Sequence, residues 1–160
     1  MRALWLAIRS IIWAVLLPGV VAFYIPWRFF GLGHLHSGPS DPKHYLGAAL
    51  VTLGVGLLAA CIWEFARRGR GTLSPLDPPK ELVVQGLYRY LRNPMYVAVS
   101  LILFGEALLI PSWLLVAYWA VFFTLVNVFV IGFEEPFLRR QFGESYERYT
   151  HKVHRWLPRF

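Results

Sequence analysis

Three stretches of this 160-residue sequence contain almost no charged side chains. Residues 10–27 and 44–63 contain no Asp, Glu, Lys or Arg, and residues 93–133 contain only Glu106. A bilayer core is about 30 Å thick and is crossed by roughly 20 helical residues. Runs of this length, in a chain that is 57% hydrophobic, predict an integral membrane protein rather than a soluble domain.

The longest of these runs is too long for one membrane crossing. Pro111 and Ser112 fall near its middle and predict a turn between two helices. The sequence therefore predicts a single all-α membrane domain over 1–160, a bundle of four transmembrane helices at about 8–28, 44–65, 94–110 and 113–133. Pro18 lies inside the first of them and is expected to kink it, which a membrane helix tolerates.

The basic residues divide unevenly between the two sides of such a bundle. Of the 16 Lys and Arg residues, only Arg28 and Lys43 fall on the external side. Because Lys and Arg favour the cytoplasmic side, we expect the loop 67–93 and both termini in the cytoplasm, beneath the cell (inner) membrane. The net charge of +7 then reflects topology and attraction to anionic lipids of the bilayer. No recognition motif accompanies this charge, so a nucleic-acid partner is not expected.

The segment after the fourth helix has the pattern of an amphipathic helix. Its apolar residues recur at steps of three or four and charges fill the other positions; the apolar stripe is Leu138, Phe142, Tyr146, Tyr149 and Val153. This predicts a cytoplasmic helix over about 135–153, with the pairs Arg140–Glu144 and Glu144–Arg148 on its surface. Such a helix lies on the membrane or folds over the cytoplasmic mouth of the bundle.

Two polar clusters, 85–96 and 134–149, bound the hairpin formed by the third and fourth helices. The first includes Asn93 and Pro94, which are typical of a helix start. A hairpin returns its ends to one face, so we expect the two clusters to lie close together. Their chemistry-bearing residues are Arg89, Arg92, Glu134, Glu135 and the tyrosines 88, 90, 96, 146 and 149.

This combination of groups suits S-adenosylmethionine. Positive charge beside exposed helix amides suits a carboxylate or phosphate, paired carboxylates suit a ribose diol or a cation, and a sulfonium is favourable beside tyrosine rings. Structural alternatives stay open at this stage. Arg89 and Arg92 can simply anchor a helix at the interface, the two glutamates can form a solvated helix junction, and tyrosines are common interfacial anchors.

The remaining polar residues indicate structural roles. Glu106 is expected to hydrogen-bond Tyr118 or Thr52, or to become neutral by taking up a proton. Asn127 is expected to join helices. No metal site is predicted, because the two histidines of the external loop lack a third ligand nearby; they are His34 and His36.

Taken in order, these residues resemble motifs of the isoprenylcysteine carboxyl methyltransferase family and the related phospholipid methyltransferases. The pattern G-x-Y-x-x-x-R-[HN]-P-x-Y is matched by Gly86, Tyr88, Arg92, Asn93, Pro94 and Tyr96. A Glu-Glu pair ends the last span, here Glu134-Glu135. The patterns F-G-x-x-Y-x-x-Y and V-x-x-x-x-P follow, matched by Phe142, Gly143, Tyr146, Tyr149, Val153 and Pro158. The resemblance covers residues 71–160, and the first two helices carry no comparable signature.

The resemblance implies a membrane enzyme that binds S-adenosylmethionine on the cytoplasmic side, beneath the C-terminal helix, and methylates a lipidic or prenylated acceptor. Its catalytic residues would be Arg92, which orients an anionic group, and Glu134 and Glu135, which orient the ribose or amino group. The cofactor site would comprise Tyr88, Arg89, Arg92, Asn93, Pro94, Tyr96, Glu134, Glu135, Tyr146 and Tyr149.

The sequence departs from the eukaryotic family pattern at two places. Asn93 stands where eukaryotic members usually have histidine, and residues 128–133 lack the arginines that eukaryotic carboxyl methyltransferases have there. The second departure disfavours a prenylcysteine carboxylate, since that anion needs a nearby cation. The alternatives are methylation of a small thiol or a phospholipid amine, or a non-catalytic membrane protein that retains the scaffold.

Overall fold

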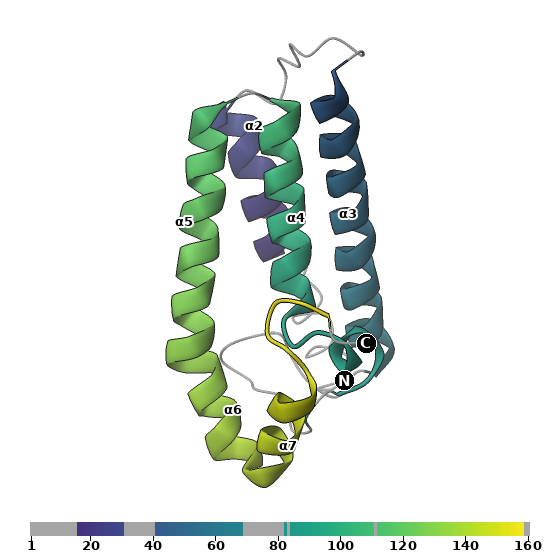
Figure 1. Cartoon of the computed structure of the whole chain (residues 1–160), viewed down its shortest axis with the longest axis vertical. Coiled ribbons are helices and arrows are strands. Elements are labelled where there is room, and N and C mark those ends of the chain that lie inside the picture. Colours follow the sequence, from purple (N-terminus) through teal and green to yellow (C-terminus); the bar gives the residue numbers. More distant parts are fainter. Residues whose placement is uncertain (1–15, 31–40, 69–81, 83, 111, 159–160) are drawn as a thin grey trace, which may run out of the picture. The chain divides into compact units, whose positions relative to one another are not determined.

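The computed structural model describes residues 16–30, 41–68, 82, 84–110 and 112–158, and every regular element within these ranges is a helix (Figure 1). His34, His36 and the start of the first predicted helix lie outside the described residues. The chain divides into two compact units. We call Leu17–Leu58 with Met95–Asn127 the helical unit, and we call the unit drawn mainly from Ala59–Pro94 and Val128–Phe160 the motif unit.

The helices lie close to their expected bounds: α3 spans Pro42–Arg68, α4 Pro94–Leu109 and α5 Trp113–Phe129. Two helices are long and apolar enough to cross a membrane, Pro42–Glu64 and Trp113–Phe142; two shorter apolar helices are Leu16–Phe30 and Pro94–Leu109. The all-α prediction is therefore confirmed for the described residues, together with two helices of spanning length. A bundle of four transmembrane helices stays a prediction.

The turn between α4 and α5 is formed where the sequence predicted it. The Ser112 amide donates to the carbonyl of Ile110 at 2.6 Å, and the Leu115 amide donates to the carbonyl of Ser112 at 3.1 Å. These bonds end one helix and begin the next, so the long apolar run is divided into two helices.

The first helix is interrupted before Pro26, whereas the turn that precedes Pro18 lies outside the described residues. Val20–Tyr24 form the π-turn η1, in which the Ile25 amide donates to the Val20 carbonyl five residues earlier, and α2 follows over Ile25–Phe30. The next donor in this register would be residue 26, but proline has no N–H. The carbonyl that it would have satisfied, Val21, instead accepts a hydrogen bond from the Tyr118 hydroxyl at 3.0 Å.

Glycines let α3 and α4 approach closely in the helical unit, where α3, α4 and α5 run side by side (Figure 1). A Cβ atom on Gly54 would lie 2.8 Å from the Ala98 carbonyl oxygen and 3.0 Å from the Ile102 amide nitrogen. A Cβ atom on Gly47 would lie 2.8 Å from the Gly105 carbonyl oxygen. Small residues one heptad apart on both helices are typical of close packing between membrane helices.

The polar residues of the helical unit differ in part from expectation. Glu106 is buried, with 4% of its surface exposed, and its Oε2 has no hydrogen-bond partner among the described residues. The Tyr118 hydroxyl donates to the Val21 carbonyl, and the Thr52 hydroxyl donates to the Ala48 carbonyl at 2.8 Å. The hydrogen bonds expected from these two residues to Glu106 are therefore not formed.

Asn127 forms a hydrogen bond within its own helix. Its side-chain amide donates to the Phe123 carbonyl one turn earlier in α5, at 3.0 Å. The packing of α4 against α5 includes the hydrogen bond from Trp119 Nε1 to Ser100 Oγ at 2.8 Å. That Asn127 joins helices stays a prediction.

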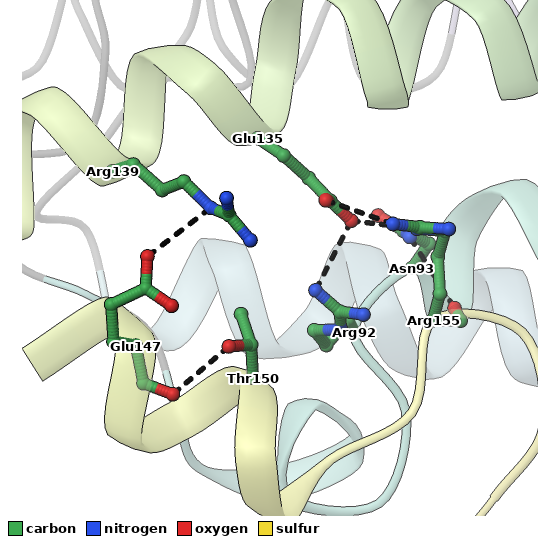
Figure 2. A network of polar contacts seen from close by, with 7 residues as sticks. All are labelled: Arg92, Asn93, Glu135, Arg139, Glu147, Thr150 and Arg155. Atoms are coloured by element: carbon green, nitrogen blue, oxygen red, sulfur yellow. Dashed lines mark hydrogen bonds and ion pairs between the residues drawn. The ribbon is translucent and has the colours of Figure 1, made fainter.

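The predicted C-terminal helix is wrong in one respect: it is two helices, α6 over Glu135–Phe142 and α7 over Glu144–Lys152. Gly143 separates them with φ 52° and ψ −129°, a conformation that interrupts a helix. Because of this break, Arg139 pairs with Glu147 at 3.3 Å, and Arg140 does not share a continuous helix with Glu144 (Figure 2). All five side chains of the predicted apolar stripe are buried or half-buried, although they do not share one helix and Val153 follows α7 in an extended conformation.

The conformation of Gly143 leads to a prediction about stability. A Cβ atom at this position meets nothing within 4 Å, so replacing Gly143 by alanine strains the backbone without a steric clash. We expect Gly143→Ala to lower the free energy of unfolding by about 1–2 kcal/mol. Gly132→Ala is the control, because that helical glycine also has open space but no positive φ. Thermal unfolding in detergent should separate the two variants; equal midpoints would show that the positive φ is not required.

Candidate active site

The two motif-bearing stretches come together within the motif unit, as the hairpin argument predicted (Figure 2). Arg92 Nη1 donates to Glu135 Oε1 at 3.1 Å. Arg155 Nε and Nη2 donate to the two oxygens of the same carboxylate at 2.6 and 2.9 Å. Glu135 therefore joins two guanidinium groups that come from segments far apart in the sequence.

This cluster brings two guanidinium groups onto one carboxylate in a mostly buried setting. The side chains of Arg92 and Glu135 are only 13% and 9% exposed, and that of Arg155 is 31% exposed. Two cations share one carboxylate, and Arg92 Nε is buried with no hydrogen-bond partner among the described residues. A buried guanidinium nitrogen that lacks a hydrogen-bond partner is costly, so Arg92 is suited to receive a further acceptor such as a carboxylate.

A second π-turn places Glu135 at the start of α6. Val130–Glu134 form η3, in which the Glu135 amide donates to the Val130 carbonyl, and Pro136 follows. This is the same spacing as η1 and Pro26, so proline explains both interruptions. A π-turn adds a residue to one helical turn and changes the direction of the side chains that follow. Glu134 therefore ends a π-turn, and Glu135 begins α6.

The chain end adds a third segment to the cluster, which we call the C-terminal strap, Val153–Arg155. The Arg92 amide donates to the His154 carbonyl at 3.0 Å, and Asn93 Nδ2 donates to the Arg155 carbonyl at 3.3 Å. Val153 is buried. α4 begins at Pro94, as the Asn93-Pro94 pair predicted, and the side-chain amide of Asn93 also holds the strap.

Two predicted tyrosines line the same region. The Tyr149 hydroxyl donates to the Tyr88 carbonyl at 2.6 Å, and the Tyr146 ring lies 6.2 Å from the Tyr149 ring. Burial raises the pKa of the Tyr146 phenol, and the Glu135 carboxylate raises it further. Burial also raises the pKa of Tyr149. Both phenols therefore stay neutral near physiological pH and contribute ring surface and hydrogen-bond donors rather than charge.

The other predicted site residues differ in burial and in the unit to which they belong. Arg89 is exposed and lies over the ring of Tyr90, 5.9 Å from its centroid. Glu134 is half-buried at the end of η3, and Pro94 is buried at the start of α4. Tyr96 is half-buried in α4 and belongs to the helical unit.

Comparison with known proteins identifies the family of this chain. The model of the phospholipid methyltransferase family matches residues 42–145, well over half of the chain. This chain belongs to the phospholipid methyltransferase family. The match includes Arg92, Asn93 and both glutamates of the Glu-Glu pair, and it ends before Tyr149 and the C-terminal strap.

Individual relatives of this family member have more varied descriptions. An uncharacterized protein of Haemophilus influenzae is 38% identical over 63 residues, which are 39% of this chain and 100% of that protein. Probable protein-S-isoprenylcysteine O-methyltransferases from indica and japonica rice are each 35% identical over 118 residues. That match covers 65% of this chain and 60% of each rice protein. The chain therefore spans less than two thirds of the rice proteins.

Two contacts of this phospholipid methyltransferase family member were missed by sequence reasoning. Arg155 was counted only as one of the cytoplasmic basic residues, although its position inside the V-x-x-x-x-P motif was a usable signal. Glu64 of α3 lies against Gly86, where its carboxylate occupies the space that a Cβ atom would need, and it accepts from the Leu87 amide at 3.4 Å. Gly86 has φ 63° and begins the short helix η2 (Gly86–Arg89), so the first motif position requires glycine for two reasons.

Proposed function

We propose that this family member is an S-adenosylmethionine-dependent membrane methyltransferase that acts on a lipidic or prenylated acceptor. The observation that supports this best is the ion pair between Arg92 and Glu135 at 3.1 Å, which joins two motifs 43 residues apart. Family membership supports methyl transfer. The names of the rice relatives support an acceptor of the isoprenylcysteine type.

The residues of the cluster fit the cofactor chemically. The buried Nε of Arg92, which has no hydrogen-bond partner among the described residues, suits the methionyl carboxylate of S-adenosylmethionine. Glu134 or Glu135 would orient the ribose hydroxyls or the amino group, and the rings of Tyr146 and Tyr149 suit a neighbouring sulfonium. When bound, the cofactor supplies an electrophilic methyl group.

The chain's own contribution to the reaction is then positioning and exclusion of water. Glu135 is paired with two guanidiniums and is a weak proton acceptor. The cluster therefore suits an acceptor that arrives with its nucleophile already free, such as a carboxylate, a thiolate or a neutral amine. Proximity and desolvation in a site with little exposed surface would provide most of the rate enhancement.

The proposed topology has four transmembrane helices, with the loop 67–93, the C-terminal helices and both termini in the cytoplasm. The four apolar helices and the uneven distribution of basic residues support it. In this arrangement the cofactor enters from the cytosol, and the acceptor reaches the site from the inner membrane through a gap between helices.

A phospholipid amine is the second candidate acceptor, and the family match favours it. A small thiol is a further alternative on the same scaffold. The absence of arginine from residues 128–133 removes one cation that a carboxylate acceptor would use. The identity of the acceptor therefore requires a direct experiment.

Transfer of a labelled methyl group provides that experiment. The purified protein in detergent is incubated with methyl-labelled S-adenosylmethionine and, separately, with total lipid, a prenylcysteine and a set of small thiols. We expect label in the lipid or prenylcysteine fraction and loss of transfer in Arg92→Ala. Label only in the thiols would replace the proposed acceptor. Cofactor binding without transfer to any pool would indicate a scaffold that has lost turnover.

A further inference from the structure

The C-terminal strap gives Arg155 a closer contact with Glu135 than Arg92 has. Arg155 engages both carboxylate oxygens, at 2.6 and 2.9 Å, whereas Arg92 reaches one of them at 3.1 Å. Bidentate pairing fixes the orientation of a carboxylate and is stronger than a single bond. The bond that Glu135 accepts also raises the pKa of the Arg155 guanidinium, which keeps it charged. Arg155 is therefore the principal counterion of Glu135.

The backbone holds Arg155 in this position from both sides. The strap is bonded to Arg92 through the carbonyl of His154 and to Asn93 through the carbonyl of Arg155 itself. Val153, at its start, is buried and its amide donates to the Tyr149 carbonyl at 3.0 Å. Two consecutive residues of the first motif thus secure the segment that delivers Arg155 to Glu135.

Charge balance shows what this contact does for Arg92. If Arg155 were absent, Arg92 and Glu135 would form a neutral one-to-one pair. With Arg155 present, Glu135 is satisfied by a second cation, and the buried Arg92 retains positive charge and an unpartnered Nε. We propose that Arg155 is a positioning residue: by holding Glu135, it leaves Arg92 able to bind the anionic group of the cofactor. This inference rests on the proposed function.

The inference assigns different tasks to the two glutamates of the motif. Glu135 is held by two guanidiniums and serves to organise the arginines. The task of orienting the ribose or amino group then falls to Glu134, which precedes it and is half-buried. A carboxylate that both arginines share cannot be given up to a ligand without leaving two buried cations side by side.

The test is a set of variants whose cofactor affinity is measured by calorimetry in detergent with S-adenosylmethionine. Arg155→Ala should bind on the order of tenfold more weakly, because Glu135 then neutralises Arg92. The double variant Arg155→Ala with Glu135→Gln should recover most of the lost affinity, since it restores an uncompensated Arg92. Arg155→Lys keeps the charge but gives up the bidentate contact, so its affinity should lie between those of Arg155→Ala and the unmodified chain.

Each outcome of this test has a distinct meaning. Unchanged affinity in Arg155→Ala would overturn the inference. A double variant that binds as weakly as Arg155→Ala would also overturn it. That second result would indicate that Arg155 contacts the cofactor or only anchors the chain end. Thermal unfolding without ligand shows whether each variant is folded. The unfolding midpoint of Arg155→Lys is the reference for a folded protein. No binding by the unmodified chain would overturn the proposed function itself.

Discussion

Replacing Gly54 by leucine is expected to destroy the packing of α3 against α4. The added Cβ atom would lie within 2.8–3.0 Å of the Ala98 carbonyl oxygen and the Ile102 amide nitrogen. These are backbone atoms, so no side-chain rotation can relieve the overlap, and the two helices have to separate. We expect the free energy of unfolding to fall by about 3 kcal/mol or more, at the upper end of the range for overpacked sites.

Gly56→Leu is the matched control for this variant. Gly56 lies two residues further along the same helix, and a Cβ atom there meets nothing within 4 Å. The same change in residue type and in helix propensity is therefore made without the close approach. Thermal unfolding in detergent should show a large loss for Gly54→Leu and little change for Gly56→Leu. Similar midpoints for the two variants would contradict the close packing at Gly54.

Replacing Glu135 by alanine is expected to have an effect of similar size on the motif unit. It removes the carboxylate that contacts both Arg92 and Arg155, and each guanidinium loses this ion pair. Breaking a buried ion pair by removing one partner typically costs about 3–5 kcal/mol. Because Arg155 is partly exposed and can turn toward water, we expect the free energy of unfolding to fall by about 3 kcal/mol.

Glu144→Ala is the control for this second variant. Glu144 also pairs with an arginine, Arg148 at 3.5 Å, but its side chain is 93% exposed. Exposed ion pairs contribute little to stability, so no measurable change is expected in unfolding or in cofactor binding. Chemical unfolding in detergent should therefore separate the two glutamate variants. A Glu135→Ala protein as stable as Glu144→Ala would show that the cluster does not hold the motif unit together.

The sequence was informative about helices because their signals are local. Charge-free runs located α3, α4 and α5 to within a few residues, and the pair at 111–112 located the turn. The break at Gly143 was missed because the apolar stripe continues through it, from Phe142 to Tyr146, so the periodicity contains no interruption. Only the backbone angle of the glycine reveals the change of direction.

The candidate site was partly predictable for a related reason. Arg92, Asn93 and Glu135 stand in motifs at the two ends of a helical hairpin, so their proximity followed from topology. Arg155 was not foreseen because its role depends on how the last segment folds back and pairs with Arg92 and Asn93. That pairing is between backbone atoms that carry no sequence pattern. Glu64 was missed likewise, since a spatial contact connects it to Gly86.

The most direct test of the proposed site is a titration of the purified chain with S-adenosylmethionine in detergent, for the unmodified chain and for Arg92→Ala. Arg140→Ala serves as control, because that arginine is exposed on α6. We predict saturable binding by the unmodified chain and by Arg140→Ala, and binding weakened at least about tenfold in a folded Arg92→Ala protein. Equal affinity in all three proteins would contradict the account, because Arg92 would then only anchor a helix.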